Sequence, residues 1–405
     1  MRRYGIEPAG DAREDGSKDY IQTIGISRSR FEVNPSLSYT SAGAAKKYEH
    51  GKDIVVFRMY SESVSGTLTK LKKGEKPKAG SIALVTNENS DMSLGLMQRI
   101  GSLLESGASA VIVEEDKRVR AGWVPFSRRP ISFSGFAGSK QGRGAAIIFV
   151  SHAVAKELST VADGEKIEVR GKLKPAEIRN TWNAVGMIKG SDPKLSSEVI
   201  LLSAHMDHVG VRPTTPGDDK IFNGADDDAS GCVAVLELAK VLVNGKRPKR
   251  TVYFAFYGSE EAGGFGSRYF VANLPFPKEK LIANLQIEMI GRPDPKVAAD
   301  ELWLTGYTRS NLGVELSKHG GKIVNDPHPE ENFFRRSDNY TLAREGVIAH
   351  TLSSFGLHKD YHQPSDENDT IDFGHMNRAI NAMIKPVTWL VNSDFRPEWY
   401  EGMRP

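Results

Sequence analysis

The chain has 405 residues, of which 39% are hydrophobic, so it can form one large core and a second, smaller domain. Its 54 Lys and Arg nearly balance 51 Asp and Glu, and a net charge of +3 is too small to predict a nucleic-acid or membrane surface. The single cysteine, Cys232, excludes an internal disulfide and any zinc site built from cysteines. A metal site would therefore need His and carboxylate ligands, and Cys232 itself, in the apolar run CVAVLELA, is expected in the core.

No stretch approaches the roughly 18 consecutive apolar residues that a membrane span requires. The start, MRRYGIEPAGD, lacks the apolar segment of a signal peptide and looks like the end of a helix followed by a turn. We expect a chain without a membrane span, from a secreted or periplasmic parent whose signal peptide has been removed.

Short apolar runs in the first half predict the strands of a small α/β or mixed-sheet unit. They lie at 82–86, 110–115 and 146–151, and the stretch 93–108 has the pattern of a helix. The polar stretch 122–144 is expected to be loop without a catalytic set. A new unit is expected to begin within 172–186, where a polar, Pro-containing segment leads into a strand.

From about residue 180 the pattern becomes strand, loop and helix. The stretches 198–208, 251–261 and 283–291 are continuous apolar runs that end in charged or imidazole side chains, as strands buried on both faces would. Helices are predicted over 230–243 and 376–392. Because ligands of open α/β sheets gather at the carboxyl ends of strands, these polar ends indicate one shared site.

The first polar strand end is SAHMDH, in which His205 and Asp207 are two residues apart. The period of two in a strand places both side chains on one side. A histidine ligand needs an acceptor on its second ring nitrogen, and Asp207 is suited to that role. By itself, this pair is equally typical of structural or surface polar residues.

Three successive acids, in NGADDDASG, precede a predicted helix. So much like charge is costly unless a cation neutralises it. The alternative is an acidic helix N-cap at Asp228 or Ser230, and both interpretations can hold for different members of the triplet.

Two adjacent glutamates, Glu260 and Glu261, end the strand TVYFAFYGS. Neighbouring side chains diverge there, so one can bind a metal while the other faces a water molecule. That division suits metal-assisted hydrolysis, in which a separate carboxylate removes the proton of the water. Alone, such a pair is usually surface charge.

Glu288 lies in the otherwise apolar strand LQIEMIG, where a buried carboxylate needs a partner such as a metal. His362, in the turn-rich DYHQPSDE, could be a ligand or an ordinary loop histidine. Four further histidines are expected to be ordinary hydrogen-bonded residues: His208, His328, His350 and His358.

The order of these motifs resembles that of the co-catalytic di-zinc aminopeptidase family, which includes glutamate carboxypeptidase-like enzymes. The motifs that carry the resemblance are AHMDH, GADDDASG, SEEAG, the acid in IEMIG, RRSDNY and YHQPSDE. The resemblance covers about residues 180–395. It implies an α/β fold with a mixed, mostly parallel sheet flanked by helices. It also implies hydrolysis of a peptide substrate at its N-terminal residue by two Zn²⁺ ions, for which Co²⁺ or Mn²⁺ could substitute.

The resemblance further implies the ligand set. Asp227 would bridge the two metals, His205 and Glu288 would complete one site, and Glu261 and His362 would complete the other. Glu288 departs from the family members that carry Asp at this position, and its longer side chain has a different reach.

Other roles implied by the resemblance concern catalysis and backbone. Glu260 would be the general base, Asp207 would orient His205, and Tyr361 would donate a hydrogen bond to the tetrahedral oxyanion. The peptide bond between Asp227 and Asp228 would be cis. RRSDNY, in which Asn339 replaces the His of some relatives, would line the substrate pocket.

The first-half unit resembles the protease-associated domain that is often inserted in this family. The expected division is 1–45 and 176–405 for the catalytic domain and 46–175 for the inserted, smaller, β-rich domain.

Two alternatives remain open at this stage. A carboxypeptidase or N-acyl-amino-acid amidohydrolase could use the same metals, with Arg292, Arg335 or Arg336 binding the substrate carboxylate. A non-catalytic, receptor-like scaffold is disfavoured by the intact ligands and base. No nucleic-acid partner is expected, and the sequence does not indicate an oligomeric state.

Overall fold

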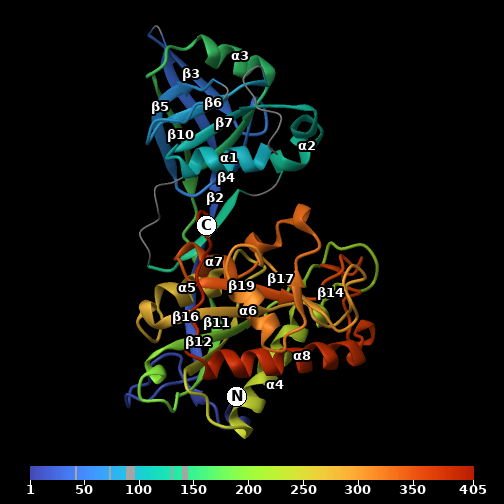
Figure 1. The fold of residues 1–405 in the computed structure, drawn as a ribbon. Helices are drawn as coiled ribbons and strands as arrows, with labels where there is room; N and C mark the ends of the chain where they lie inside the picture. The colour runs from blue at the N-terminus through green and yellow to red at the C-terminus, as the bar shows by residue number, and fades with distance from the viewer. Residues whose placement is uncertain (42, 73, 88–95, 129–130, 139–144) are drawn as a thin grey trace. The chain divides into compact units, whose positions relative to one another are not determined.

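The computed structural model describes residues 1–41, 43–72, 74–87, 96–128, 131–138 and 145–405 (Figure 1). It divides into two compact units, the first formed by Met1–Ile24 with Asn180–Pro405 and the second by Gly25–Arg179.

The boundary expected at residue 45 differs from the one observed. Residues 25–45 belong to the second unit because β2 (Ile21–Ser41) continues into it as one long strand. There β2 pairs with β3 (Ala44–Glu49), β8 (Ser132–Phe136) and β10 (Lys166–Leu173). No glycine or proline cluster interrupts the strand between 21 and 33, so no sequence signal marks a boundary there.

The first unit contains a mixed sheet with the strand order β1–β11–β15–β12–β16–β19–β17–β18. The strands are β1 (Glu7–Pro8), β11 (Glu177–Ile188), β12 (Val199–His205), β15 (Thr251–Tyr257), β16 (Leu281–Ile287), β17 (Leu302–Leu304), β18 (Ile323–Asn325) and β19 (Ile348–Ser353). Strands β15, β12, β16 and β19 run parallel, with antiparallel neighbours on either side. The predicted α/β fold with a mostly parallel sheet is confirmed.

Helices cover both faces of this sheet (Figure 1). One face packs against α4 (Gly231–Asn244), α6 (Leu312–Lys318) and α8 (Phe373–Asn392), and the other against α5 (Phe265–Ala272) and α7 (Asn339–Arg344). Burial on both faces explains why β12, β15 and β16 are apolar almost throughout. The predicted strands and the two predicted helices are confirmed here.

Short elements complete the first unit. They are the turns Arg2–Tyr4, Leu195–Ser197, Ala225–Ser230, Lys278–Lys280, Pro329–Glu331, Phe333–Arg335 and Asn368–Thr370, and the strand pair β13 (Gly210–Val211) and β14 (Ile221–Phe222).

Arg250 connects the end of α8 to the sheet through hydrogen bonds. Its side chain is fully buried, and its Nε lies 2.7 Å from Oε2 of Glu198. Its Nη1 and Nη2 donate to the carbonyl oxygens of Leu390 and Phe395 at 2.9 and 2.8 Å. All three nitrogens therefore have acceptors, as a buried guanidinium requires.

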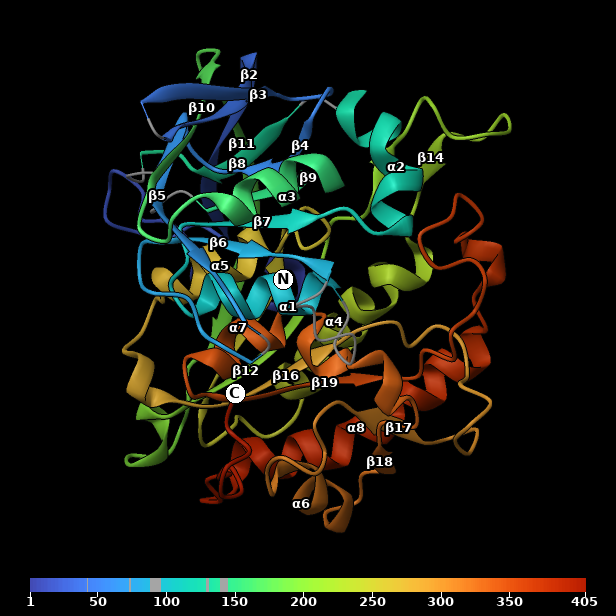
Figure 2. The ribbon, with the colours of Figure 1, turned by 90° about the horizontal axis from the view of Figure 1, so that it is seen from above.

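The second unit has its own sheet, with the order β5–β6–β7–β9–β4, in which the first three pairs are parallel and the last is antiparallel. These strands are β4 (Ile54–Met59), β5 (Ser63–Lys70), β6 (Ile82–Val85), β7 (Ala110–Glu114) and β9 (Ala146–Val150). Helices α1 (Leu96–Glu105) and α2 (Lys117–Arg128) pack on one face and α3 (His152–Thr160) on the other (Figure 2). The three predicted strands are confirmed.

The stretches 93–108 and 122–144 of this unit differ in how well they match the expectation. The predicted helix at 93–108 forms over the residues of α1, and 93–95 lie outside the described residues. The expected loop at 122–144 is wrong in part, because it contains the end of α2 and all of β8. Residues 129–130 and 139–144 of that stretch lie outside the described residues.

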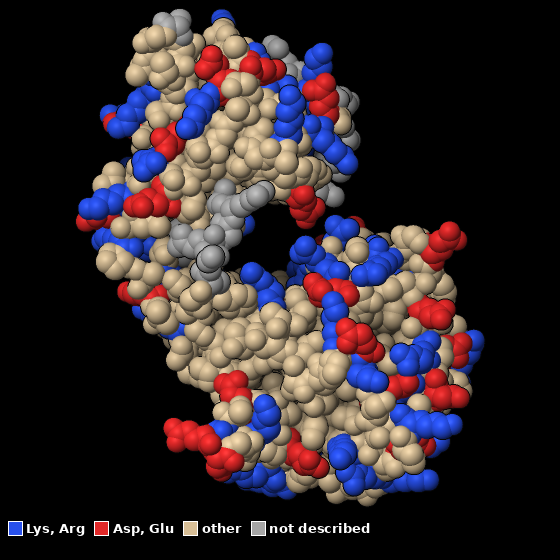
Figure 3. Space-filling model, turned by 90° about the vertical axis from the view of Figure 1, so that its left-hand side faces the viewer, with Lys and Arg blue, Asp and Glu red and all other residues tan. Residues whose placement is uncertain are grey.

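Charges of both signs are interspersed on the face drawn in Figure 3, as the near-balanced composition predicts. None of the helices in the described part of the chain has the length and apolar character needed to cross a membrane.

Candidate metal centre

The five predicted ligands lie around the carboxyl ends of the parallel strands. His205 is the last residue of β12, Glu288 directly follows β16, and Glu261 follows β15 after a short turn. Asp227 lies in the turn before α4, and His362 comes from the segment between β19 and α8.

Asp227 occupies the middle of this group. Its Oδ1 lies 3.1 Å from Nε2 of His205, and its Oδ2 lies 3.2 Å from Nε2 of His362. The same His362 nitrogen is 2.9 Å from Oε1 of Glu261. The two oxygens of Asp227 therefore face two different sets of donors, as a bridging ligand requires. The peptide bond between Asp227 and Asp228 is cis, as the resemblance implied.

Two groups of potential ligand atoms lie close enough to hold a metal ion. One consists of His205, Asp227 and Glu288, and the other of His208, Asp227 and Glu261, with all ligand atoms of a group within 4.8 Å of one another. His208, which was expected to be an ordinary histidine, lies among these potential ligands. Its side chain is buried, and its Nδ1 lies 3.1 Å from Oε1 of Glu261 and 3.7 Å from Oδ2 of Asp227.

Asp207 lies beside His205 but acts differently from the expectation. Nδ1 of His205 donates to the backbone carbonyl of Asp207 at 3.0 Å, whereas the Asp207 carboxylate is 3.9 Å away. That carboxylate instead accepts hydrogen bonds from the backbone N–H groups of Glu260 and Glu261, at 2.9 and 3.2 Å. Asp207 thus positions the residues of the expected base and of a ligand.

Asp228 and Ser337 form hydrogen bonds with residues of the site. The Asp228 carboxylate accepts hydrogen bonds from the backbone N–H groups of His205, Gly231 and Met289. Ser337 donates a hydrogen bond to Oε2 of Glu288. Asp228 therefore links β12, the start of α4 and the end of β16, which is a structural role rather than that of a third ligand.

Burial and crowding of carboxylates dominate the electrostatics. Burial raises the pKa of Glu260 to about 9, and the negative charges of Asp338, Glu288 and Glu261 oppose its ionisation, although His205 favours it. Burial likewise raises the pKa of Glu288. So many acidic groups in one pocket would be stabilised by cations.

At His362 and Asp227, contacts with oppositely charged groups outweigh the effect of burial on the pKa. Burial disfavours the charged form of His362, but its contacts with Asp227 and Glu261 outweigh that effect and raise its pKa to about 9. The pKa of Asp227 is held below its ordinary value because His205 and His362 outweigh its burial. Asp227 is therefore a carboxylate, the form in which it can bind metal.

Tyr361 lies next to the metal centre, in contact with His362. Its ring stacks on that of His362 with centroids 3.9 Å apart, and burial raises the pKa of its hydroxyl, so the group is a hydrogen-bond donor at neutral pH. Tyr361 and Glu288 line a small pocket beside the site. Its apolar lining comes from Met289, Trp303, Phe333 and Phe355.

The remaining histidines of the expected ordinary class have hydrogen-bond partners. His328 contacts Asp294, His350 contacts Thr305 and Ser310, and His358 contacts Asp226. Asn339, in the expected wall segment, is buried and bonds to Phe334, Ala349 and Thr351 instead.

Sequence reasoning missed His208 and Ser337. His208 lies one residue beyond Asp207 in AHMDH, so its closeness to the other polar residues was a usable signal. Ser337 gave none, because a serine in RRSDNY has no distinctive pattern.

The sequence model of the family described as "Peptidase family M28" matches residues 183–387, just over half of the chain. The chain therefore belongs to peptidase family M28.

Among curated relatives, "Leucine aminopeptidase 2" of Arthroderma otae is 31% identical over 282 residues, covering 62% of this chain and 54% of the relative. "Leupeptin-inactivating enzyme 1" of Streptomyces exfoliatus is 34% identical over 241 residues, covering 53% and 52%. The chain thus spans about half the length of these relatives. The solved "Aminopeptidase from Aneurinibacillus sp. strain AM-1" has a TM-score of 0.50 at 19% identity, over 96% of this chain and 86% of that one, which shows a shared fold.

Proposed function

We propose that this chain is a zinc-dependent aminopeptidase, an exopeptidase that removes N-terminal residues from peptides with the help of two metal ions. The observation that carries this proposal is the position of Asp227, whose two carboxylate oxygens face separate sets of His and carboxylate donors. Family membership and the names of the aminopeptidase relatives support the same activity.

The donor set fits zinc. His205, Asp227 and Glu288 would hold one ion, and Asp227, Glu261 and His362 the other, all with nitrogen or oxygen donors that Zn²⁺ accepts. Among the described residues, Oε1 of Glu261 is buried 2.9 Å from Nε2 of His362 and 3.1 Å from Nδ1 of His208 but forms a hydrogen bond with neither, as oxygen and nitrogen ligands that share a cation would. Co²⁺ or Mn²⁺ could replace Zn²⁺ at such ligands. When bound, the metals would polarise the scissile carbonyl and lower the pKa of the attacking water.

The side chains around the donors supply the proton transfers. Glu260, held through its backbone by Asp207, would take a proton from the attacking water at its carboxylate and pass it to the leaving amine. The hydroxyl of Tyr361 would donate a hydrogen bond to the oxyanion that forms on the substrate carbonyl. The apolar cavity beside Glu288 would accept an apolar side chain of the residue that is removed.

The arginines that kept a carboxypeptidase or amidohydrolase possible already have internal partners. Arg292 binds Asp360 and Asp366, Arg336 binds Glu331, and the guanidinium of Arg335 lies over the ring of Tyr340. This favours a substrate with a free N-terminus over one that needs a carboxylate-binding arginine.

A pair of substrates tests the proposal. We expect the zinc-loaded protein to hydrolyse leucyl-p-nitroanilide and to leave N-acetyl-leucine intact. Hydrolysis of N-acetyl-leucine alone would support the amidohydrolase instead, and hydrolysis of neither by protein shown to carry zinc would contradict a catalytic role.

We also propose that the second unit is a protease-associated domain. The support is its position as an insertion and its separate sheet with helices on both faces.

A further inference from the structure

The segment that carries Tyr361 and His362 has no regular structure to hold it. Residues 354–367, between β19 and the turn before α8, form neither helix nor strand. His362 also has a φ of 55°, a left-handed backbone conformation that persists in a non-glycine residue only where its surroundings enforce it. Contacts made by neighbouring side chains therefore help to fix the position of His362.

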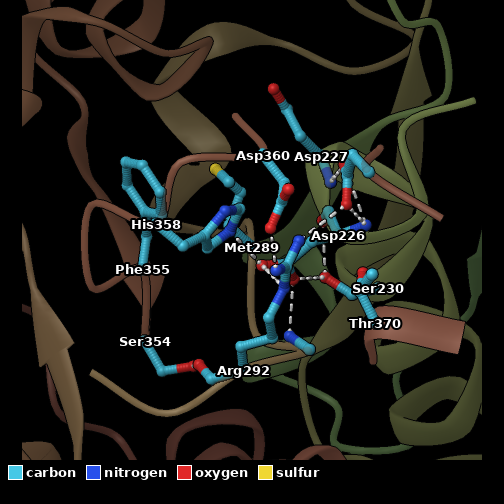
Figure 4. A network of polar contacts seen from close by, with 12 residues as sticks. Asp226, Asp227, Ser230, Met289, Arg292, Ser354, Phe355, His358, Asp360 and Thr370 are labelled. Carbon is cyan, nitrogen blue, oxygen red and sulfur yellow. Dashed lines mark hydrogen bonds and ion pairs between the residues drawn. The ribbon is translucent and has the colours of Figure 1, made fainter. Parts of the chain in front are cut away.

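Arg292 supplies such contacts from the other side of the site, just beyond β16. Its Nη1 lies 2.8 Å from Oδ2 of Asp360 (Figure 4). Its Nη2 lies 3.1 Å from Oδ1 of Asp366. These two aspartates flank Tyr361 and His362 in the chain. The guanidinium therefore binds this segment on both sides of Tyr361 and His362 in the chain.

The same contacts reach the bridging ligand. The fully buried carboxylate of Asp366 accepts hydrogen bonds from the backbone N–H groups of Asp226 and Asp227, at 3.1 Å or slightly longer. The carboxylate of Asp226 accepts one from the backbone N–H of Gly291 at 2.7 Å, next to Arg292 itself. Arg292, Asp366 and Asp226 thus join three separate segments that meet at the metal centre.

The charge of this cluster depends on Arg292. Asp226 and Asp366 are fully buried, Asp360 is nearly so, and His358 contacts Asp226 at 3.0 Å. Removing the guanidinium would leave buried carboxylates without their cation, which is strongly unfavourable. A lysine would restore the charge but, as a point charge, could not bind both aspartates with the spacing of a planar fork.

We propose that Arg292 is a positioning residue for the second metal position, which holds His362 and Tyr361 in place relative to Asp227. This inference rests on the proposed function, since it assigns His362 to a metal ion. It predicts that changes at Arg292 act on the metal bound by Glu261 and His362 and spare the one bound by His205 and Glu288.

Zinc binding measured by competition with a chromophoric chelator tests the proposal. The variants are Arg292→Lys and, in case that one folds poorly, Asp360→Asn, which removes one partner of the guanidinium. We expect one of the two zinc equivalents to lose 10- to 100-fold in affinity, as for other residues that support metal ligands, and the other to stay within 2- to 3-fold.

The matched control is Arg250→Lys, which also alters a buried arginine but one that contacts Glu198, Leu390 and Phe395 instead. Folded Arg250→Lys protein should bind both zinc equivalents as the unaltered chain does. If Arg250→Lys loses affinity for one zinc equivalent to the same degree, the effect is general destabilisation and the proposal is overturned.

Hydrogen exchange of the protein after treatment with EDTA gives a second readout that needs no metal. The backbone N–H groups of Tyr361 and Gln363 donate to the carbonyl oxygens of His358 and Asp360. We expect these amides to exchange faster in Arg292→Lys while those of β12 remain unchanged. Unchanged exchange and unchanged zinc affinity in both variants would refute the proposal, whereas failure of the unaltered chain to bind two zinc ions would instead refute the proposed function.

Discussion

Glu260 and Glu261 are adjacent in the chain, yet their surroundings assign them different tasks. Glu261 contacts His208 and His362, and these contacts outweigh burial and lower its pKa. Burial dominates for Glu260 and raises its pKa. Cations bound at the neighbouring ligands would favour the ionised form of Glu260, the form in which a carboxylate can accept a proton.

Substitutions separate the base from the ligands. Glu260→Gln should keep nearly all of the zinc while kcat falls by about 10²- to 10⁴-fold, because the general base is lost. Asp227→Ala should instead lose zinc, because the residue between the two donor sets is removed. Elemental analysis alongside kinetics checks both outcomes, and equal zinc loss in the two variants would show that the roles are not divided in this way.

Two histidines compete for one metal position. His362 lies nearer than His208 to both Asp227 and Glu261, at 3.2 and 2.9 Å against 3.7 and 3.1 Å. We therefore expect His362→Ala to bind one zinc equivalent per chain and His208→Ala to retain two. Isothermal titration with zinc distinguishes them, and the reverse pattern would make His208 the ligand.

At the level of elements, β19 carries a buried histidine that must stay neutral. Nδ1 of His350 donates to the carbonyl of Thr305 at 2.7 Å, and its Nε2 lies 2.8 Å from the Ser310 hydroxyl. Burial lowers the pKa of His350 to about 4. The unfolded chain, with an ordinary histidine pKa of about 6.5, binds a proton that the folded chain does not between these values.

Acidification should therefore destabilise the fold through His350. Its contribution is complete above pH 6.5 and is lost as the pH falls towards 4, at up to about 1.4 kcal/mol per pH unit. In His350→Gln, whose side chain cannot titrate, the free energy of unfolding measured by denaturant titration should fall less steeply as the pH decreases over this range. The difference between the two slopes should correspond to nearly one proton. Identical slopes in both proteins would contradict a neutral, buried His350.

Strands with uninterrupted apolar runs could be predicted because they are buried on both faces. Those that end in His205, Glu261 and Glu288 also revealed the site, since their polar ends are exceptions to an apolar pattern. Helix α2 could not be predicted in this way. Its sequence KRVRAGWVPFSR contains Pro125 and has few apolar residues, although Val119, Trp123 and Phe126 have helical spacing and pack against the core of the second unit.

At the level of the whole molecule, each unit has its own hydrophobic core. Among the described residues, no core cluster combines side chains of both units. The sequence could indicate two units because the strand patterns differ on either side of residue 180. It could not place the first boundary, since β2 runs from the first unit into the second as one continuous strand.

The central claim is that Asp227 joins two metal positions, and a crystal structure of the zinc-loaded protein with anomalous scattering measured at the zinc edge tests it directly. We expect two peaks about 3.5–4 Å apart, as in other two-metal sites, with one oxygen of Asp227 towards each. His205 and Glu288 should contact one peak, and Glu261 and His362 the other. A single peak, or an Asp227 or His362 side chain that points away from the metals, would contradict the account.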